Sequence, residues 1–145
     1  MTLEEIQQLA DKDLKLNDTE LDLESLKTPQ IHNKYSKFHS QFVNLLKKAE
    51  ADRDKLIREK WEYYTGKADP SVYQLKPFNL KILKQDVDKY IKSDDDIIKL
   101  ESKVTYISNI VDYLEKTLRL ISNRTFQIKN AIDWKKFLSG VVWYQ

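Results

Sequence analysis

The chain of 145 residues contains no cysteine, two glycines and three prolines. The absence of cysteine excludes disulfides and thiolate chemistry and fits a reducing cytoplasm. So few glycines and prolines provide too few turn residues for a β-sandwich or barrel. No apolar run reaches the roughly 18 residues that a transmembrane helix needs, and the acidic start M-T-L-E-E-I does not resemble a signal peptide. These absences predict a single helical domain over residues 1–145.

The motifs of common catalytic and metal sites are absent as well. The sequence has no glycine-rich phosphate loop, no HExxH motif and no recognisable Ser/His/Asp set. The two histidines, His32 and His39, are interpreted as surface residues. The acidic run Asp94–Asp96 invites a metal site, but the start of a helix favours acids and explains the run without a metal. We therefore predict no enzymatic activity, no metal and no cofactor.

The net charge of +2 hides an uneven distribution. Residues 1–26 carry eight acidic side chains and two lysines, which gives −6, so the remaining residues carry +8. An acidic segment ahead of a basic body indicates either separate basic and acidic partners or docking of the segment onto the body. The sequence leaves both interpretations open.

Start and stop signals divide the chain into helices. Thr2 and Glu5 form a capping box that starts a first helix. The pair Thr28-Pro29 predicts the start of a long helix, because proline is favoured at the first helical position. Ser93 is predicted to cap a second long helix. The predicted segments are an acidic helical segment 1–27, a long helix 28–66, a loop and short helix 67–92, a long C-terminal helix 93–140 and a tail 141–145.

The second long helix carries an apolar seam that steps by three and four residues from Ile97 to Ile132. More apolar residues lie beside this seam, so one facing helix cannot cover the whole stripe. Either the N-terminal helices or another subunit must cover it. These patterns predict an all-α fold, a long antiparallel helical hairpin with short N-terminal helices. The apolar tail 141–145 is interpreted as a docking tail or an edge of a subunit interface.

The stretch Arg53–Gly66 combines positive charge with flat aromatic rings. Cations beside aromatic rings suit single-stranded nucleic acid, because phosphates need charge and unpaired bases need a stacking surface. An ordinary helix end is the alternative, since the macrodipole favours cations there and aromatic side chains at helical spacing usually pack in a core. The candidate DNA-binding residues are Arg53, Lys55, Arg58, Lys60, Trp61, Tyr63, Tyr64 and Lys67.

Three stretches carry a recognisable pattern. They read K-Y-S-K-F at Lys34–Phe38, L-I-R-E-K-W-E-Y-Y-T-G at Leu56–Gly66 and S-N-R-T-F-Q-I-K-N-A-I-D-W-K-K-F at Ser122–Phe137. In this order and at nearly constant spacing, the chain resembles the UvsY family, the recombination mediators of T-even-type phages. The resemblance extends from about Asp13 to Gly140 and therefore covers most of the chain.

The resemblance implies a non-enzymatic protein that binds single-stranded DNA as a ring-like homo-oligomer, a hexamer or heptamer, in the cytoplasm of the infected bacterial host. Its implied function is to load a RecA-like recombinase of the UvsX type onto DNA coated by the phage single-strand-binding protein. The family's DNA-binding positions map to Arg58 and Lys60. Its oligomerisation helix maps to about Leu114–Phe137, with candidate contact residues Leu114, Leu118, Ile121, Ile128 and Ile132.

An adaptor is the alternative function. A helical bundle with coiled-coil seams can bind protein partners without binding nucleic acid. Binding to a labelled oligonucleotide at low salt separates the two functions, because an adaptor would show none.

Overall fold

The computed structural model describes residues 1–140, which form helices and connections and contain no strand, so the all-α prediction is confirmed for this part of the chain. The predicted role of the tail 141–145 lies outside the described residues. The described residues form two compact units: residues 1–42 with residues 110–140 form unit 1, and residues 43–109 form unit 2. The helices are α1 (Leu3–Leu14), α2 (Leu21–Tyr64), α3 (Pro70–Leu75), the 3₁₀ helix η1 (Lys84–Asp86), α4 (Val87–Lys92) and α5 (Asp95–Leu138).

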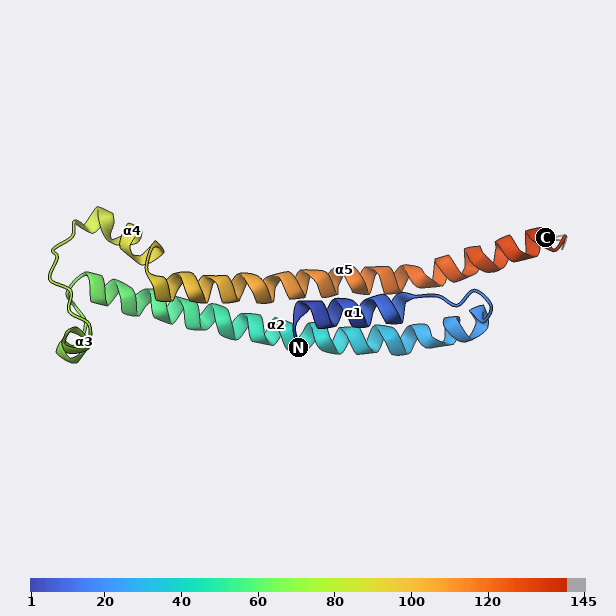
Figure 1. Cartoon of the computed structure of the whole chain (residues 1–145), viewed down its shortest axis with the longest axis horizontal. Helices are drawn as coiled ribbons and strands as arrows, with labels where there is room; N and C mark the ends of the chain where they lie inside the picture. The colour runs from blue at the N-terminus through green and yellow to red at the C-terminus, as the bar shows by residue number, and fades with distance from the viewer. Residues whose placement is uncertain (141–145) are drawn as a thin grey trace. The chain divides into compact units, whose positions relative to one another are not determined.

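Unit 1 contains α1 and facing parts of α2 and α5 (Figure 1). These parts of α2 and α5 run antiparallel, because Glu24 pairs with Arg124, whereas His39, farther along α2, meets Glu115, which comes earlier in α5. The capping box at Thr2 is formed as predicted and starts α1. The buried apolar residues of this unit are Ile6, Ala10, Leu21, Tyr35, Phe42, Ile110, Val111, Leu114, Ile121 and Ile128.

Unit 2 contains the end of α2, the start of α5, and α3, η1 and α4 between them. The two long helices are again antiparallel here, since Arg53 pairs with Glu101 and Lys60 pairs with Asp96. The unit has its own apolar cluster, formed by Val87, Ile91 and Ile97 with Leu56, Ile57, Tyr64 and Ile82 packed against it.

The long helix α2 begins earlier than the sequence predicts. It starts at Leu21, and Pro29 lies inside it rather than at its first turn. A proline within a helix loses one backbone hydrogen bond and is normally unfavourable. Here Glu24, in the turn that precedes the proline, is buried and paired with Arg124 of α5. This tertiary contact holds the first turns of α2 in place, which the local sequence signal could not reveal.

The start of α5 and the connection before it also differ from the prediction. The cap is Asp94, whose side chain accepts hydrogen bonds from the backbone N–H groups of Asp96 at 2.9 Å and Ile97 at 3.3 Å. Ser93 instead donates its hydroxyl to the carbonyl of Lys89 at 2.7 Å and so closes α4. Within 67–92, where one loop and one short helix are predicted, the structure has α3, η1 and α4, and residues 77–83 are not helical.

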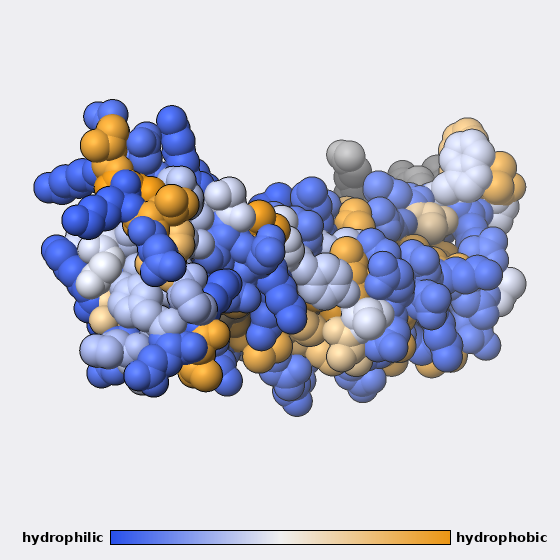
Figure 2. Space-filling view, turned by 60° about the vertical axis from the view of Figure 1, so that its left-hand side comes forward, coloured by the Kyte–Doolittle hydropathy of each residue, from blue (hydrophilic) through white to orange (hydrophobic). Residues whose placement is uncertain are grey.

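Apolar side chains remain at the surface after both cores are filled. Most positions of the predicted α5 seam are buried, among them Ile97, Val104 and Ile107. Other apolar residues stay exposed, and Figure 2 shows that on one face of the molecule they reach the surface in several separate places among hydrophilic residues. Within residues 1–140, none of the helices combines the length and hydropathy that crossing a membrane requires.

Candidate nucleic-acid interface

The end of α2 is fixed by a network of backbone and hydroxyl hydrogen bonds. Gly66 adopts the left-handed conformation, with φ of 77°, as its predicted position at the helix end requires. The N–H of Lys67 donates to the carbonyl of Glu62 at 2.8 Å, and the hydroxyl of Thr65 donates to the carbonyl of Trp61 at 2.7 Å. The side chains of Trp61 and Lys67 therefore project from a defined turn.

The two tyrosines of the candidate site are packed into unit 2. The hydroxyl of Tyr63 donates to the carbonyl of Lys76 at 3.0 Å, and its ring stacks on that of Tyr73 at a centroid distance of 5.4 Å. Phe78 contacts the rings of both Tyr63 and Tyr64. Only 6% of Tyr63 is exposed, whereas 40% of Trp61 is exposed. Tyr64 is half-buried, so Trp61 is the most exposed of the three candidate stacking rings.

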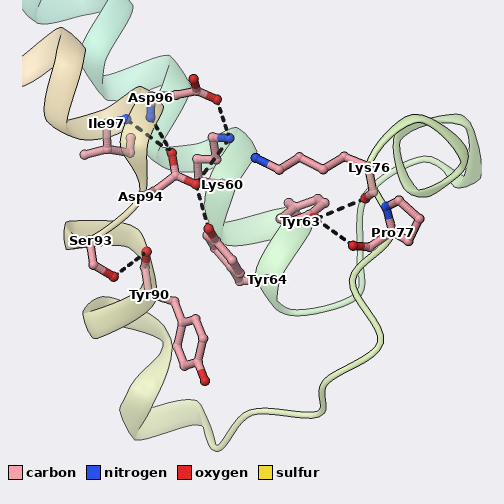
Figure 3. Close-up of polar contacts among 10 residues, drawn as sticks. All are labelled: Lys60, Tyr63, Tyr64, Lys76, Pro77, Tyr90, Ser93, Asp94, Asp96 and Ile97. Atoms are coloured by element: carbon pink, nitrogen blue, oxygen red, sulfur yellow. Dashed lines mark hydrogen bonds and ion pairs between the residues drawn. The ribbon is translucent and has the colours of Figure 1, made fainter.

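Lys60 takes part in an ion-pair network at the start of α5 (Figure 3). Its Nζ lies 2.8 Å from the carboxylate of Asp96 and 3.3 Å from that of Asp94, and the hydroxyl of Tyr64 donates to Asp94 at 2.6 Å. The lysine side chain is only 12% exposed. These contacts join the end of α2 to the cap of α5 within unit 2.

The charges of this network reinforce one another. Burial alone would raise the pKa of Asp94, but the hydrogen bonds from Tyr64 and Ile97 and the charge of Lys60 lower it below its usual value. Burial alone would lower the pKa of Lys60, but Asp96 and Asp94 raise it. Burial and the hydrogen bond to Asp94 raise the pKa of Tyr64. The network therefore stays charged at neutral pH, with Tyr64 protonated.

The remaining cations of the candidate site divide into paired and exposed residues. Arg53 lies 3.5 Å from Asp54 and 3.7 Å from Glu101. Lys55 and Arg58 are exposed and make no ion pair within residues 1–140. Lys67 lies over the ring of Trp61, with its Nζ 4.5 Å from the ring centroid. Lys55, Arg58 and Trp61 are spaced three residues apart and so share one face of α2.

The acidic run Asp94–Asp96 stabilises the start of α5, a position at which acidic side chains are favoured. Asp94 caps α5 and accepts from Tyr64, and Asp96 pairs with Lys60. In the described part of the chain, no three His, Asp or Glu side chains gather as a metal ion would need.

The candidate subunit-contact residues lie mainly in the core of unit 1. Leu114, Ile121 and Ile128 are buried, while Leu118 and Ile132 are half-buried. The largely exposed apolar residues are on the other side of the same helix. At 100° per residue they fall within about a third of its circumference, and they are Leu120, Phe126, Trp134, Phe137 and Leu138.

The acidic N-terminal segment docks in part onto basic residues of its own unit. Asp13 accepts from Lys34 at 2.7 Å and from the hydroxyl of Tyr35 at 2.8 Å. Glu24 pairs with Arg124, and the carbonyl of Asp18 accepts from Lys135. Other acids, among them Glu4, Asp11 and Asp22, stay exposed, so docking accounts for some of the acidic charge and leaves the rest at the surface.

The structure adds residues that the sequence patterns did not single out. The connection between α3 and α4 brings Phe78, Lys81 and Lys84 to the hollow beside Trp61 and Lys67. The sequence did offer a signal, because two lysines follow closely after an aromatic residue.

Comparisons with known proteins agree on one family. The family model described as "Recombination, repair and ssDNA binding protein UvsY" matches residues 9–141. The recombination protein uvsY of Enterobacteria phage T4 is 24% identical over 140 residues, which is 97% of this chain and 99% of that protein.

Solved structures show the same fold. A crystal structure of the bacteriophage T4 recombination mediator protein UvsY, in lattice type II, has a TM-score of 0.85 at 24% identity and covers 96% of this chain and 98% of that one. The lattice type I structure has a TM-score of 0.82 at 22% identity, with 92% and 98% covered.

Proposed function

The chain belongs to the UvsY family of recombination, repair and single-stranded-DNA-binding proteins, and from this premise we propose that it loads a RecA-like recombinase of the UvsX type onto single-stranded DNA. The DNA in question is coated by the phage single-strand-binding protein, which is the second protein partner. The protein works in the cytoplasm of the infected host, by binding and without catalysing a reaction.

The observation that supports DNA binding is the face of α2 that ends at Trp61. Lys55 and Arg58 lie there with their charges unpaired within the described residues, next to an accessible aromatic ring. Unpaired cations neutralise phosphates, and a ring accepts an unstacked base. Lys60, Tyr63 and Tyr64 hold the helix end in shape, and Arg53 joins α2 to Glu101 of α5. These four residues contribute to DNA binding through the shape of the helix.

We propose that several copies of this face act together in a homo-oligomer, a hexamer or heptamer. One copy offers few phosphate contacts, and the net charge of the chain is only +2. Repetition around a closed assembly turns weak local contacts into tight binding through multivalency. The exposed apolar side of α5, opposite the core of unit 1, is the proposed contact between copies.

Replacing Lys55 and Arg58 together with alanine is expected to weaken binding to single-stranded DNA. The slope of log affinity against log salt concentration should fall by about 0.7 for each phosphate contact that is lost. Fluorescence anisotropy of a labelled oligonucleotide across a salt series measures this slope. The matched control is Lys99→Ala with Lys103→Ala, which removes the same charge from exposed positions of α5. An unchanged slope in the first variant, or an equal loss in both variants, would count against DNA binding by this face of α2. If the unaltered protein does not bind the oligonucleotide at all, the adaptor function is favoured.

Loading of the recombinase is tested by the rate of its ATP hydrolysis on coated DNA. Adding this protein should shorten the lag before hydrolysis begins, because the recombinase then gains access to the strand. The Lys55/Arg58 variant should leave the lag long, and the Lys99/Lys103 control should shorten it. If the unaltered protein binds DNA but does not change the lag, mediation is wrong and DNA binding stands.

A further inference from the structure

A hollow of about 570 Å³ lies beside the end of α2, within unit 2. One wall is the helix end with Trp61 and Lys67, and the other is the connection from Phe78 to Val87. This volume falls within the range of small-molecule sites, which is about 300–1,000 Å³. The hollow can therefore receive a ligand of the size of a nucleotide.

The charge in this hollow has one sign. Three of its lining residues are lysines, Lys67, Lys81 and Lys84, and no aspartate or glutamate lines it. Within residues 1–140, Lys81 and Lys84 are exposed and make no ion pair. Such a concentration of unpaired ammonium groups attracts an anion.

A hollow on another side of the same helix end provides the contrast. It measures about 410 Å³ and includes Lys60. Its lining also contains four carboxylates, from Glu59, Glu62, Asp69 and Asp96. Carboxylates repel phosphates, so this side of the helix end does not suit a nucleic-acid strand.

The aromatic rings of the first hollow make contacts within unit 2. The ring of Trp61 packs against Lys67, whose Nζ lies 4.5 Å from the ring centroid. Phe78 is held by edge contact with Tyr64 at a centroid distance of 5.1 Å. A ring that is already in position loses little entropy when a base stacks on it.

The two side-chain hydroxyls of the lining that could distinguish one base from another are already engaged. The hydroxyl of Tyr64 donates to Asp94, and that of Thr65 donates to the carbonyl of Trp61. The lysines are donors on flexible stems, and they suit phosphates better than the edge of a particular base. The lining therefore favours a nucleotide without favouring its base.

We propose that this hollow binds one nucleotide of a single-stranded DNA, with the base against Trp61 and Phe78 and the neighbouring phosphates on Lys67, Lys81 and Lys84. The inference rests on the proposed DNA binding and extends it, because it adds residues beyond α2 and directs the strand from Lys55 and Arg58 past Trp61 into the hollow. The side of the helix end that carries Lys60 then does not bind DNA, and Lys60 pairs with Asp94 and Asp96.

The test compares two double variants that remove equal charge. Lys81→Ala with Lys84→Ala should reduce the salt slope of oligo-dT binding by about 0.7 for each lost contact. Lys89→Ala with Lys92→Ala, on α4 and outside the lining, should leave the slope unchanged. Oligo-dA and oligo-dT should bind the unaltered protein equally within about threefold.

A second measurement examines the base directly. Trp61→Ala should weaken binding about tenfold, the loss expected for one stacked base, and Trp61→Phe should restore most of it. An oligonucleotide that carries 5-iododeoxyuridine should photo-crosslink to Trp61, and mass spectrometry of the peptides identifies the residue. Circular dichroism confirms that each variant is as helical as the unaltered protein.

The outcomes separate this inference from the proposed function. If the unaltered protein binds DNA, but the two double variants behave alike and the crosslink lies elsewhere, the nucleotide site is wrong and DNA binding stands. If the unaltered protein does not bind the oligonucleotide at low salt, both are wrong.

Discussion

Replacing Glu24 with alanine is expected to lower the free energy of unfolding by about 3–5 kcal/mol, because it leaves a buried guanidinium without its partner. Arg124 is 1% exposed and Glu24 4% exposed, and the two side chains pair directly. The Nε and Nη1 atoms of Arg124 have no hydrogen-bond partner in the described chain. The charge of Arg124 is therefore compensated mainly by Glu24.

This loss is large compared with the stability of a typical protein. The free energy of unfolding of a typical domain is about 5–15 kcal/mol, so the variant would lose a large part of the total. Urea unfolding followed by circular dichroism measures the loss, at a fixed protein concentration because the proposed assembly would add to the apparent stability. An Arg124→Ala variant should lose less, since Lys27 also lies 3.1 Å from Glu24 and can still pair with it.

A double variant is the control for this prediction. Glu24→Leu with Arg124→Met removes both charges and should come close to the stability of the unaltered protein, because a buried pair often adds little over apolar residues of similar size. The hydrogen bond from Arg124 and the charge of Lys27 lower the pKa of Glu24. The contribution of Glu24 to the free energy of unfolding is therefore fully present above the pKa that Glu24 has in the unfolded chain. It is lost as the pH falls through the lower pKa that Glu24 has in the folded protein. A single variant as stable as the unaltered protein would refute the pairing.

Placing a charge at Phe126 is expected to separate the copies of the proposed homo-oligomer. Phe126→Asp should shift the mass measured by light scattering toward the 17.3 kDa of one chain, because a carboxylate cannot be buried between apolar surfaces without a partner. Phe126 is 66% exposed, so the substitution should not disturb the core of unit 1. Trp134→Asp, on the same side of α5, should act in the same direction.

The controls for this experiment lie on the same helix. Ser122→Asp introduces the same charge at an exposed position outside the apolar stripe and should leave the mass unchanged. Ile128→Asp should unfold unit 1 and lower the helical signal, since Ile128 belongs to its core. A Phe126→Asp protein of unchanged mass would show that copies do not meet at this stripe, and an unaltered protein of single-chain mass would contradict assembly altogether.

Signals that act within one or two turns of helix predicted their features well. The capping box at Thr2 is where the sequence placed it, and the predicted ends of the long helices, at 66 and 140, coincide with glycines in the left-handed conformation. Most of the apolar seam positions predicted in α5 are buried in the structure. Each depends on hydrogen bonds or periodicity over a few residues, so the sequence contains the necessary information.

Features that depend on distant partners were not predictable in this way. Pro29 marks a helix start by local rules, yet α2 continues through it because Glu24 meets a residue 100 positions away. Ser93 and Asp94 are both good caps by type. Asp94 takes the role while also binding Tyr64 and Lys60, which come from the preceding long helix.

The candidate site shows the same division. Charge and aromatic residues singled out Arg53–Gly66 as the candidate segment, but the residues there have different environments. Lys60 pairs with a carboxylate 36 positions away, and Tyr63 packs among rings from the following connection. Lys55, Arg58 and Trp61 stay exposed. No local pattern separates these groups, because burial depends on which segments fold against the helix.

The sequence by itself determined the all-α class, the ends of several helices, the apolar seams and the family. Composition, helical period and collinear motifs along the chain are enough for these. Only the tertiary structure decided which cations are free, which aromatic ring is accessible, and which lysines join them from outside α2. Ion pairing, burial and the walls of a hollow arise between residues that are distant in the chain, and folding alone brings them together.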